Sequence, residues 1–102
     1  MELSILERIV LQGLLPQESD FVTFRIIREL KNELSFTEDE FKKFKITQDN
    51  SQIKWNSEGQ KHLKKVEIGE KATSIIVDAF KKLNEAGKIN EDNYLLYEKF
   101  IN

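Results

Sequence analysis

The chain has 102 residues, of which 39% are apolar and 33% are charged, and its 16 basic and 18 acidic side chains leave a net charge of −2. This length predicts a single domain over residues 1–102, with a core large enough to fold without metal or disulfide crosslinks. Because the chain has no cysteine, disulfides, thiolate zinc sites, iron–sulfur clusters and cysteine nucleophiles are excluded.

The chain also lacks the sequence features of export and membrane insertion. Its first residues, Met-Glu-Leu-Ser-Ile-Leu, do not lead from a basic region into an apolar stretch, as a secretory signal does. The most apolar runs, 9–15 and 74–80, are interrupted by Gln12 and Asp78 and are shorter than the ~20 residues of a membrane-spanning helix. We therefore expect a cytoplasmic protein that does not enter the membrane.

Two helices are predicted in the first third of the chain. Ser4 and Glu7 have the spacing of a capping box, and Pro16 ends the helix that follows. A second helix is predicted over 21–34, capped by Ser19 or Asp20, as the central helix of the core. The apolar faces are Ile5, Leu6, Ile9, Val10 and Leu14 in the first helix and Phe24, Ile27, Leu30 and Leu34 in the second.

The third helix has the clearest start signal in the sequence. Thr37 and Glu40 form a capping box, and Phe36 and Phe41 occupy the positions of a hydrophobic staple, which predicts a short helix from Glu38 to about residue 43. The acidic cluster 38–40 is interpreted as the usual enrichment of carboxylates at a helix N-terminus rather than as a catalytic group.

The apolar pattern then changes to a period of two, which indicates a β-hairpin. Phe44, Ile46, Ile53 and Trp55 alternate with polar residues around the dipeptide 49–50. A turn at that dipeptide predicts that Ile46 lies opposite Ile53 and Phe44 opposite Trp55, with both pairs on one face. Trp55 is accordingly interpreted as a core residue.

The last half of the chain predicts two more helices. Residues 56–68 favour a loop and then a short strand at Val66 and Ile68, although Ser57 and Gln60 also fit the cap of a short helix. A helix follows Gly69 and ends near Gly87, and Asn90 caps a final helix over 91–100. The predicted fold class is α+β: about five helices, mainly helical, with a small antiparallel hairpin or three-stranded sheet after the third helix, winged-helix-like in its first half.

Few residues are suited to catalysis or cofactor binding. His62 is the single histidine, so an HExxH zinc site is excluded, and a Ser-His-Asp triad has no supporting motif. We interpret His62 as solvent-exposed. The four glycines are too scattered for a nucleotide-binding loop. We therefore expect no enzyme activity, no cofactor and no metal, and an enzyme based on carboxylates and lysines alone has no positive signal.

The charge is unevenly distributed along the chain. Residues 42–66 contain seven lysines against Asp49 and Glu58, a local charge of +5, so the remainder carries −7. This pattern supports the alternative hypothesis of a winged-helix-like regulator that binds nucleic acid. Its contact residues would be Lys43, Lys45, Lys54, Lys61, Lys64 and Lys65. The acidic start of the third helix and the absence of arginine after Arg28 favour a merely solvated lysine face instead.

The last helix carries more apolar residues than one face accommodates. Leu95 and Leu96 are adjacent to Tyr94 and Tyr97, and Phe100 and Ile101 follow. The helix is either clamped between two elements of its own domain, or its surplus, Tyr94, Tyr97 and Ile101, forms an interface. We expect a non-enzymatic protein–protein interaction module that binds a protein partner or a second copy of itself through this helix.

Four segments also suggest a resemblance. Leu14-Leu15-Pro16, residues 21–41, Ile53-Lys54-Trp55-Asn56 and Leu96-Tyr97-Glu98-Lys99-Phe100 are similar to small uncharacterised proteins of bacteria and their phages over nearly the whole chain. The resemblance implies a bacterial or phage-infected cytoplasm and a phage or prophage origin. It implies no particular activity and no site residues.

Overall fold

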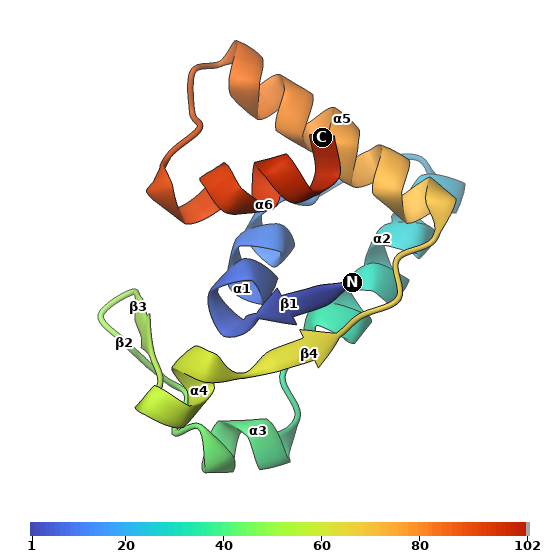
Figure 1. Ribbon diagram of the computed structural model, residues 1–102. Helices are drawn as coiled ribbons and strands as arrows, with labels where there is room; N and C mark the ends of the chain where they lie inside the picture. Colours follow the sequence, from blue (N-terminus) through green and yellow to red (C-terminus); the bar gives the residue numbers. More distant parts are fainter. Residues whose placement is uncertain (102) are drawn as a thin grey trace.

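The structure is a computed structural model that describes residues 1–101. Those residues form an α+β fold that is mainly helical, with six helices and two antiparallel sheets of two strands each (Figure 1). The elements in chain order are β1 (Glu2–Ser4), α1 (Ile5–Leu14), α2 (Phe21–Leu34), α3 (Glu38–Lys43), β2 (Thr47–Asp49), β3 (Gln52–Lys54), α4 (Ser57–Lys61), β4 (Leu63–Lys65), α5 (Glu70–Glu85) and α6 (Glu91–Ile101).

Helix α1, rather than α2, is the central helix. It contacts α2, α5 and α6, whereas α2 contacts α1 and α5 (Figure 1). The inward row of α1 is Ile5, Arg8 and Leu11, all buried. The expectation that α2 is central was wrong because, beyond its first turn, the exposed side of α2 is charged and polar, including Arg25 and Arg28, and such a face remains in water.

The helix starts agree closely with the capping signals. Ser4 with Glu7, and Thr37 with Glu40, form reciprocal capping boxes, and the Asp20 side chain accepts a hydrogen bond from the backbone N–H of Thr23. Asn90 caps α6 by accepting from the backbone N–H groups of Asp92 and Asn93. The Asn93 side chain accepts in turn from the Asn90 N–H. These bonds satisfy backbone donors that the first turn of a helix leaves unpaired.

The hairpin forms, but its register differs from the expected one. Gln48 lies opposite Ile53, and the turn residues are Asn50 and Ser51, with φ of 47° and 67°. Two positive φ angles define a turn whose twist matches that of the strands. The predicted pairs Ile46–Ile53 and Phe44–Trp55 were therefore wrong, because the true register is shifted by two residues.

A shift of two residues leaves each side chain on the same face. The predicted apolar face is therefore preserved: Ile53 and Trp55 pack against a cluster of the buried residues Ile5, Phe44 and Ile46. The interpretation of Trp55 as a core residue is confirmed by this packing. Its indole N–H also donates to the Gln60 side chain, at 2.7 Å.

The secondary structure predicted for residues 56–68 was only partly right. A short helix, α4, forms where a loop was favoured, and its cap is Asn56 rather than Ser57. The strand that follows is β4, which ends just before Val66, so the strand predicted at Val66 and Ile68 was misplaced. Strand β4 pairs with β1, so that Leu3 lies opposite Lys64. The hairpin therefore has no third strand among the described residues, and the winged-helix likeness gains no support from the strand pairing.

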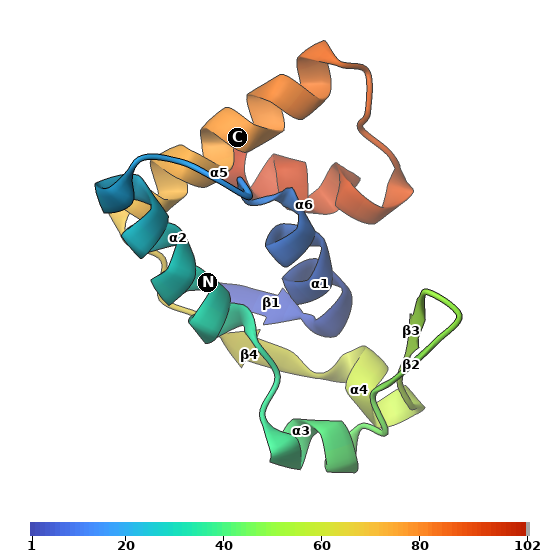
Figure 2. The ribbon, with the colours of Figure 1, turned by 180° about the vertical axis from the view of Figure 1, so that it is seen from behind.

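The main hydrophobic core lies between α1, α2, α5 and α6. Leu3 of β1 and Val66, which directly follows β4, close it on one side, and the chain between α1 and α2 passes across α5 (Figure 2). The buried members are Leu3, Leu11, Leu15, Ile27, Leu30, Leu34, Val66, Ala72, Ile76, Phe80 and Leu96.

Candidate protein interface

The three predicted interface residues of α6 do not share one environment. Tyr94 is 54% exposed. Tyr97 is partly buried, and its ring meets the Phe80 ring edge-on at 5.5 Å between centroids. Ile101 packs against the main core. The structure therefore assigns Tyr97 and Ile101 mainly to the chain's own core, and Tyr94 to the surface.

The apolar side chain of α6 with the largest exposed fraction is that of Leu95, which was not among the predicted interface residues. It is 67% exposed, and Leu6 of α1 is 36% exposed. Both line a groove of about 580 Å³ between α1 and α6, with Leu96 among its lining residues. The polar lining residues are Ser4, Glu7, Glu91, Asp92, Glu98 and Lys99.

An ion pair ties the two walls of this groove together. The Lys99 ammonium lies 2.7 Å from a carboxylate oxygen of Glu7 and also donates to the backbone carbonyl of Glu2. Glu7 in turn belongs to the capping box of α1. This ion pair therefore bridges α1 and α6 at the groove, whose lining carries four carboxylates against one ammonium.

A second exposed apolar surface lies at the start of α2. Phe21 is 79% exposed and Val22 is 57% exposed. The guanidinium of Arg25 lies over the Phe21 ring, 5.5 Å from its centroid. Phe21, Phe24, Arg25 and Arg28 line a shallow pocket of about 320 Å³ together with Glu29 and Asn32. This surface is therefore apolar with two guanidinium groups at its side.

The six candidate lysines are divided between different surroundings. Lys64 is partly buried and donates to the backbone carbonyl of Glu33 at 3.2 Å. The ammonium of Lys43 lies 5.6 Å from the Phe44 ring centroid. Lys45, Lys54 and Lys61 are exposed.

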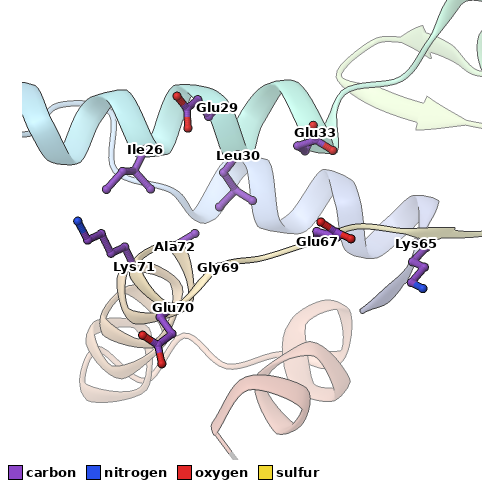
Figure 3. Close-up of a pocket in the computed structure, with 10 residues that line it drawn as sticks. All are labelled: Ile26, Glu29, Leu30, Glu33, Lys65, Glu67, Gly69, Glu70, Lys71 and Ala72. Atoms are coloured by element: carbon purple, nitrogen blue, oxygen red, sulfur yellow. The ribbon is translucent and has the colours of Figure 1, made fainter.

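The sixth lysine, Lys65, belongs to a different part of the surface. It lines a groove of about 950 Å³ between α2 and the start of α5, shown in Figure 3. The lining of that groove carries four carboxylates, Glu29, Glu33, Glu67 and Glu70, against the ammonium groups of Lys65 and Lys71. Lys65 therefore lines an acidic groove, and none of the other five candidate lysines lines it with Lys65.

The most strongly perturbed carboxyl group belongs to Glu40. Hydrogen bonds from the Arg8 guanidinium lower the pKa of Glu40 from 4.5 to about 2. His62, which was expected to be solvent-exposed, is instead partly buried: its ring stacks on Phe44 at 4.5 Å, and its Nε2 lies 3.5 Å from Glu40. Glu40 thus joins α1, α3 and the α4–β4 connection, a structural arrangement that sequence reasoning missed.

No group of three or more His, Cys, Asp or Glu side chains in residues 1–101 is placed to hold a metal ion. No helix in the same part of the chain has the length and apolarity needed to cross a membrane. Glu38 and Asp39 are exposed in the first turn of α3, as expected for residues at a helix N-terminus.

Comparisons with known proteins found no relative of this chain. No protein-family model matches the chain, and neither curated proteins nor solved structures give a match. The resemblance to small bacterial and phage proteins therefore stays a prediction.

Proposed function

We propose that this chain is a non-enzymatic protein–protein interaction module, and that its binding surface is the groove between α1 and α6. The observation that carries the proposal is that the exposed side chains of Leu95 and Leu6 line one groove together with a rim of carboxylates. Exposed apolar side chains that adjoin one another and are rimmed by polar groups are typical of contact sites.

The chemistry of the groove defines the partner. A fitting segment offers apolar side chains for Leu6 and Leu95, and lysine or arginine for the carboxylates of Glu91, Asp92 and Glu98. Such complementarity favours correct partners and disfavours acidic ones. In keeping with the resemblance, we place this role in the cytoplasm of a bacterium or a phage-infected cell.

A selection from a randomised peptide-display library, with the folded chain as bait, tests the proposal. We expect the selected peptides to be rich in leucine or phenylalanine together with lysine or arginine. Their binding should fall roughly tenfold or more for Leu95→Glu. Leu63→Glu is the matched control, because Leu63 is 52% exposed but belongs to β4, outside the groove. Peptides that bind Leu95→Glu as well as the wild type would refute the proposal.

A nucleic-acid-binding role is the second candidate, favoured by the exposed lysines at one end of the molecule. Lys43 ends α3, Lys54 ends β3, and Lys61 ends α4. Asn56 joins these elements: its side chain donates to the Lys43 carbonyl and its backbone N–H to the Phe44 carbonyl. Lysines grouped in this way can contact a phosphate backbone.

Fluorescence anisotropy with a labelled DNA duplex at low salt tests this second candidate. Binding that weakens with added salt and with Lys54→Glu, but not with Lys81→Glu, would support it. Lys81 is an exposed lysine of α5, so the control makes the same charge change elsewhere. Absence of DNA binding by the wild type, or an equal loss of DNA binding in both variants, would refute the nucleic-acid-binding role.

A further inference from the structure

We propose that the partner of the α1–α6 groove is a second copy of this chain, which docks through the start of its α2. The inference rests on the proposed function, because it names the occupant of the same groove. The inference also involves a second surface, which was not part of the interface predicted from the sequence. This surface consists of Phe21, Val22, Arg25 and Arg28. The contact is between two different surfaces rather than between two copies of one.

The first argument is the complementarity of charge. The groove lining presents Glu7, Glu91, Asp92 and Glu98 against Lys99. The α2 pocket presents Arg25 and Arg28 against Glu29. Opposite charges beside two apolar patches attract one surface to the other, while two grooves, or two α2 surfaces, placed face to face would repel.

The second argument is the match of apolar groups. Phe21 has the largest exposed fraction, 79%, of the large apolar side chains in the described part of the chain, and Leu95 follows with 67%. The cap of α2 is made by Asp20 and Thr23 and does not need Phe21, whose ring is contacted by the Arg25 guanidinium of the same helix. The groove of about 580 Å³ lies within the size range of pockets that bury drug-sized ligands, so it has room for the side chains of Phe21 and Val22.

One neighbouring group opposes the charge match. Asp20 precedes Phe21, and its carboxylate would approach the acidic rim of the groove. That carboxylate accepts the Thr23 backbone N–H, which lowers the pKa of Asp20. The group therefore remains charged but is directed toward its own helix end, while Arg25 and Arg28 lie one and two turns further along α2.

The two surfaces lie on opposite sides of the molecule. The start of α2 is far from the starts of α1 and α6, which contribute residues to the groove, in both views (Figures 1 and 2). A contact between unlike surfaces leaves one of each free on every pair. The wild-type chain should therefore form chains or rings whose size increases with concentration, rather than a closed dimer.

Mixing two variants, each of which lacks one of the two surfaces, tests this geometry. Phe21→Glu removes the α2 surface, and Leu95→Glu removes the groove. Both residues are exposed, so circular dichroism should show unchanged folding. By sedimentation velocity, each variant alone should be monomeric at concentrations where the wild type associates. An equimolar mixture should give a one-to-one heterodimer that does not grow, because each copy retains one of the two surfaces.

Each other outcome overturns the inference. Association of Phe21→Glu alone would indicate a symmetric contact through α6, and association of Leu95→Glu alone a symmetric contact through α2. If the wild type remains monomeric at high concentration and the mixed variants form no heterodimer, the chain does not self-associate and the inference is refuted. Peptide selection on the groove is a separate measurement, so the proposed function can stand when this inference fails. Leu63→Glu serves as the control that should associate as the wild type does.

Discussion

Arg8 and Glu40, which are 32 residues apart, form a two-pronged ion pair in the interior of the fold. One terminal nitrogen of the guanidinium lies 2.7 Å from Glu40 Oε2, and the other lies 3.1 Å from Oε1. The same guanidinium donates to the carbonyls of Leu34 and Ser35 at the end of α2. Its plane lies over the Phe36 ring, 4.3 Å from the centroid. A single buried side chain of α1 therefore connects the end of α2 to the start of α3.

Replacement of Arg8 should destabilise the protein strongly. Arg8→Ala removes the guanidinium that donates to Glu40 and to the Ser35 carbonyl, whereas the Leu34 carbonyl still accepts from the Gln12 side chain. The loss of one partner from a buried ion pair costs about 3–5 kcal/mol. Arg25→Ala is the control, because Arg25 is exposed and exposed sites usually change stability by less than about 0.5 kcal/mol. Urea unfolding measures both variants. Equal free energies of unfolding for the two would contradict this role of Arg8.

Acid should weaken the fold through Glu40. Its pKa is lowered from 4.5 to about 2, so its contribution to stability is fully present above pH 4.5 and is lost as the pH falls toward 2. A shift of this size corresponds to about 3 kcal/mol, and the side chain is 14% exposed, so solvent screens it little. Besides Arg8, the cationic group of Lys64 and the ring of His62 face this carboxylate.

Glu40→Gln isolates this contribution. The variant should be less stable than the wild type at neutral pH, and the difference in the free energy of unfolding should shrink as the pH approaches 2. Urea unfolding of both proteins across this range provides the comparison. A difference that is the same at every pH would show that the ionisation of Glu40 does not stabilise the fold.

Two glycines should respond oppositely to substitution by alanine. A Cβ at Gly13 in α1 would meet nothing within 4 Å, so Gly13→Ala should stabilise by about 0.5–1 kcal/mol through reduced chain entropy. A Cβ at Gly59 would lie 3.0 Å from Ile5 Cδ1 and Phe44 Cβ and 3.2 Å from Trp55 Cδ1. Gly59→Ala should therefore destabilise by about 1–3 kcal/mol. Thermal unfolding distinguishes the two, and a shift of the same sign in both would be inconsistent with this packing.

Glycine at the second position of the hairpin turn should stabilise the protein. Ser51 has φ of 67°, a left-handed conformation that costs a residue with a Cβ roughly 1–2 kcal/mol. Allowing for the greater freedom of glycine in the unfolded chain, Ser51→Gly should raise the free energy of unfolding by about 0.5–1 kcal/mol. Gln52→Gly, one residue into β3, should instead destabilise. Failure of Ser51→Gly to raise the melting temperature would argue against this turn.

Of the proposed binding surface, the sequence indicated helix α6 but not the side chains that line the groove. Tyr94 is exposed as expected, while Tyr97 and Ile101 face the core, and Leu6 and Leu95 were not identified. Helix α6 has adjacent apolar residues on more than one face, so its periodicity does not indicate which face is buried. That choice depends on where α1 and α5 lie, which the sequence of α6 does not contain.

The sequence by itself determined the features that depend on neighbours three or four residues away. The caps at Ser4, Asp20, Thr37 and Asn90 follow from side chains that bond to backbone groups within one turn, and the alternation in the hairpin follows from the period of a strand. The tertiary structure alone decided the pairing of β4 with β1, the burial of Arg8 and the exposure of Leu95. Each of these depends on a contact between elements far apart in the chain, and such a contact forms only where the combined packing of both elements outweighs the cost of bringing them together.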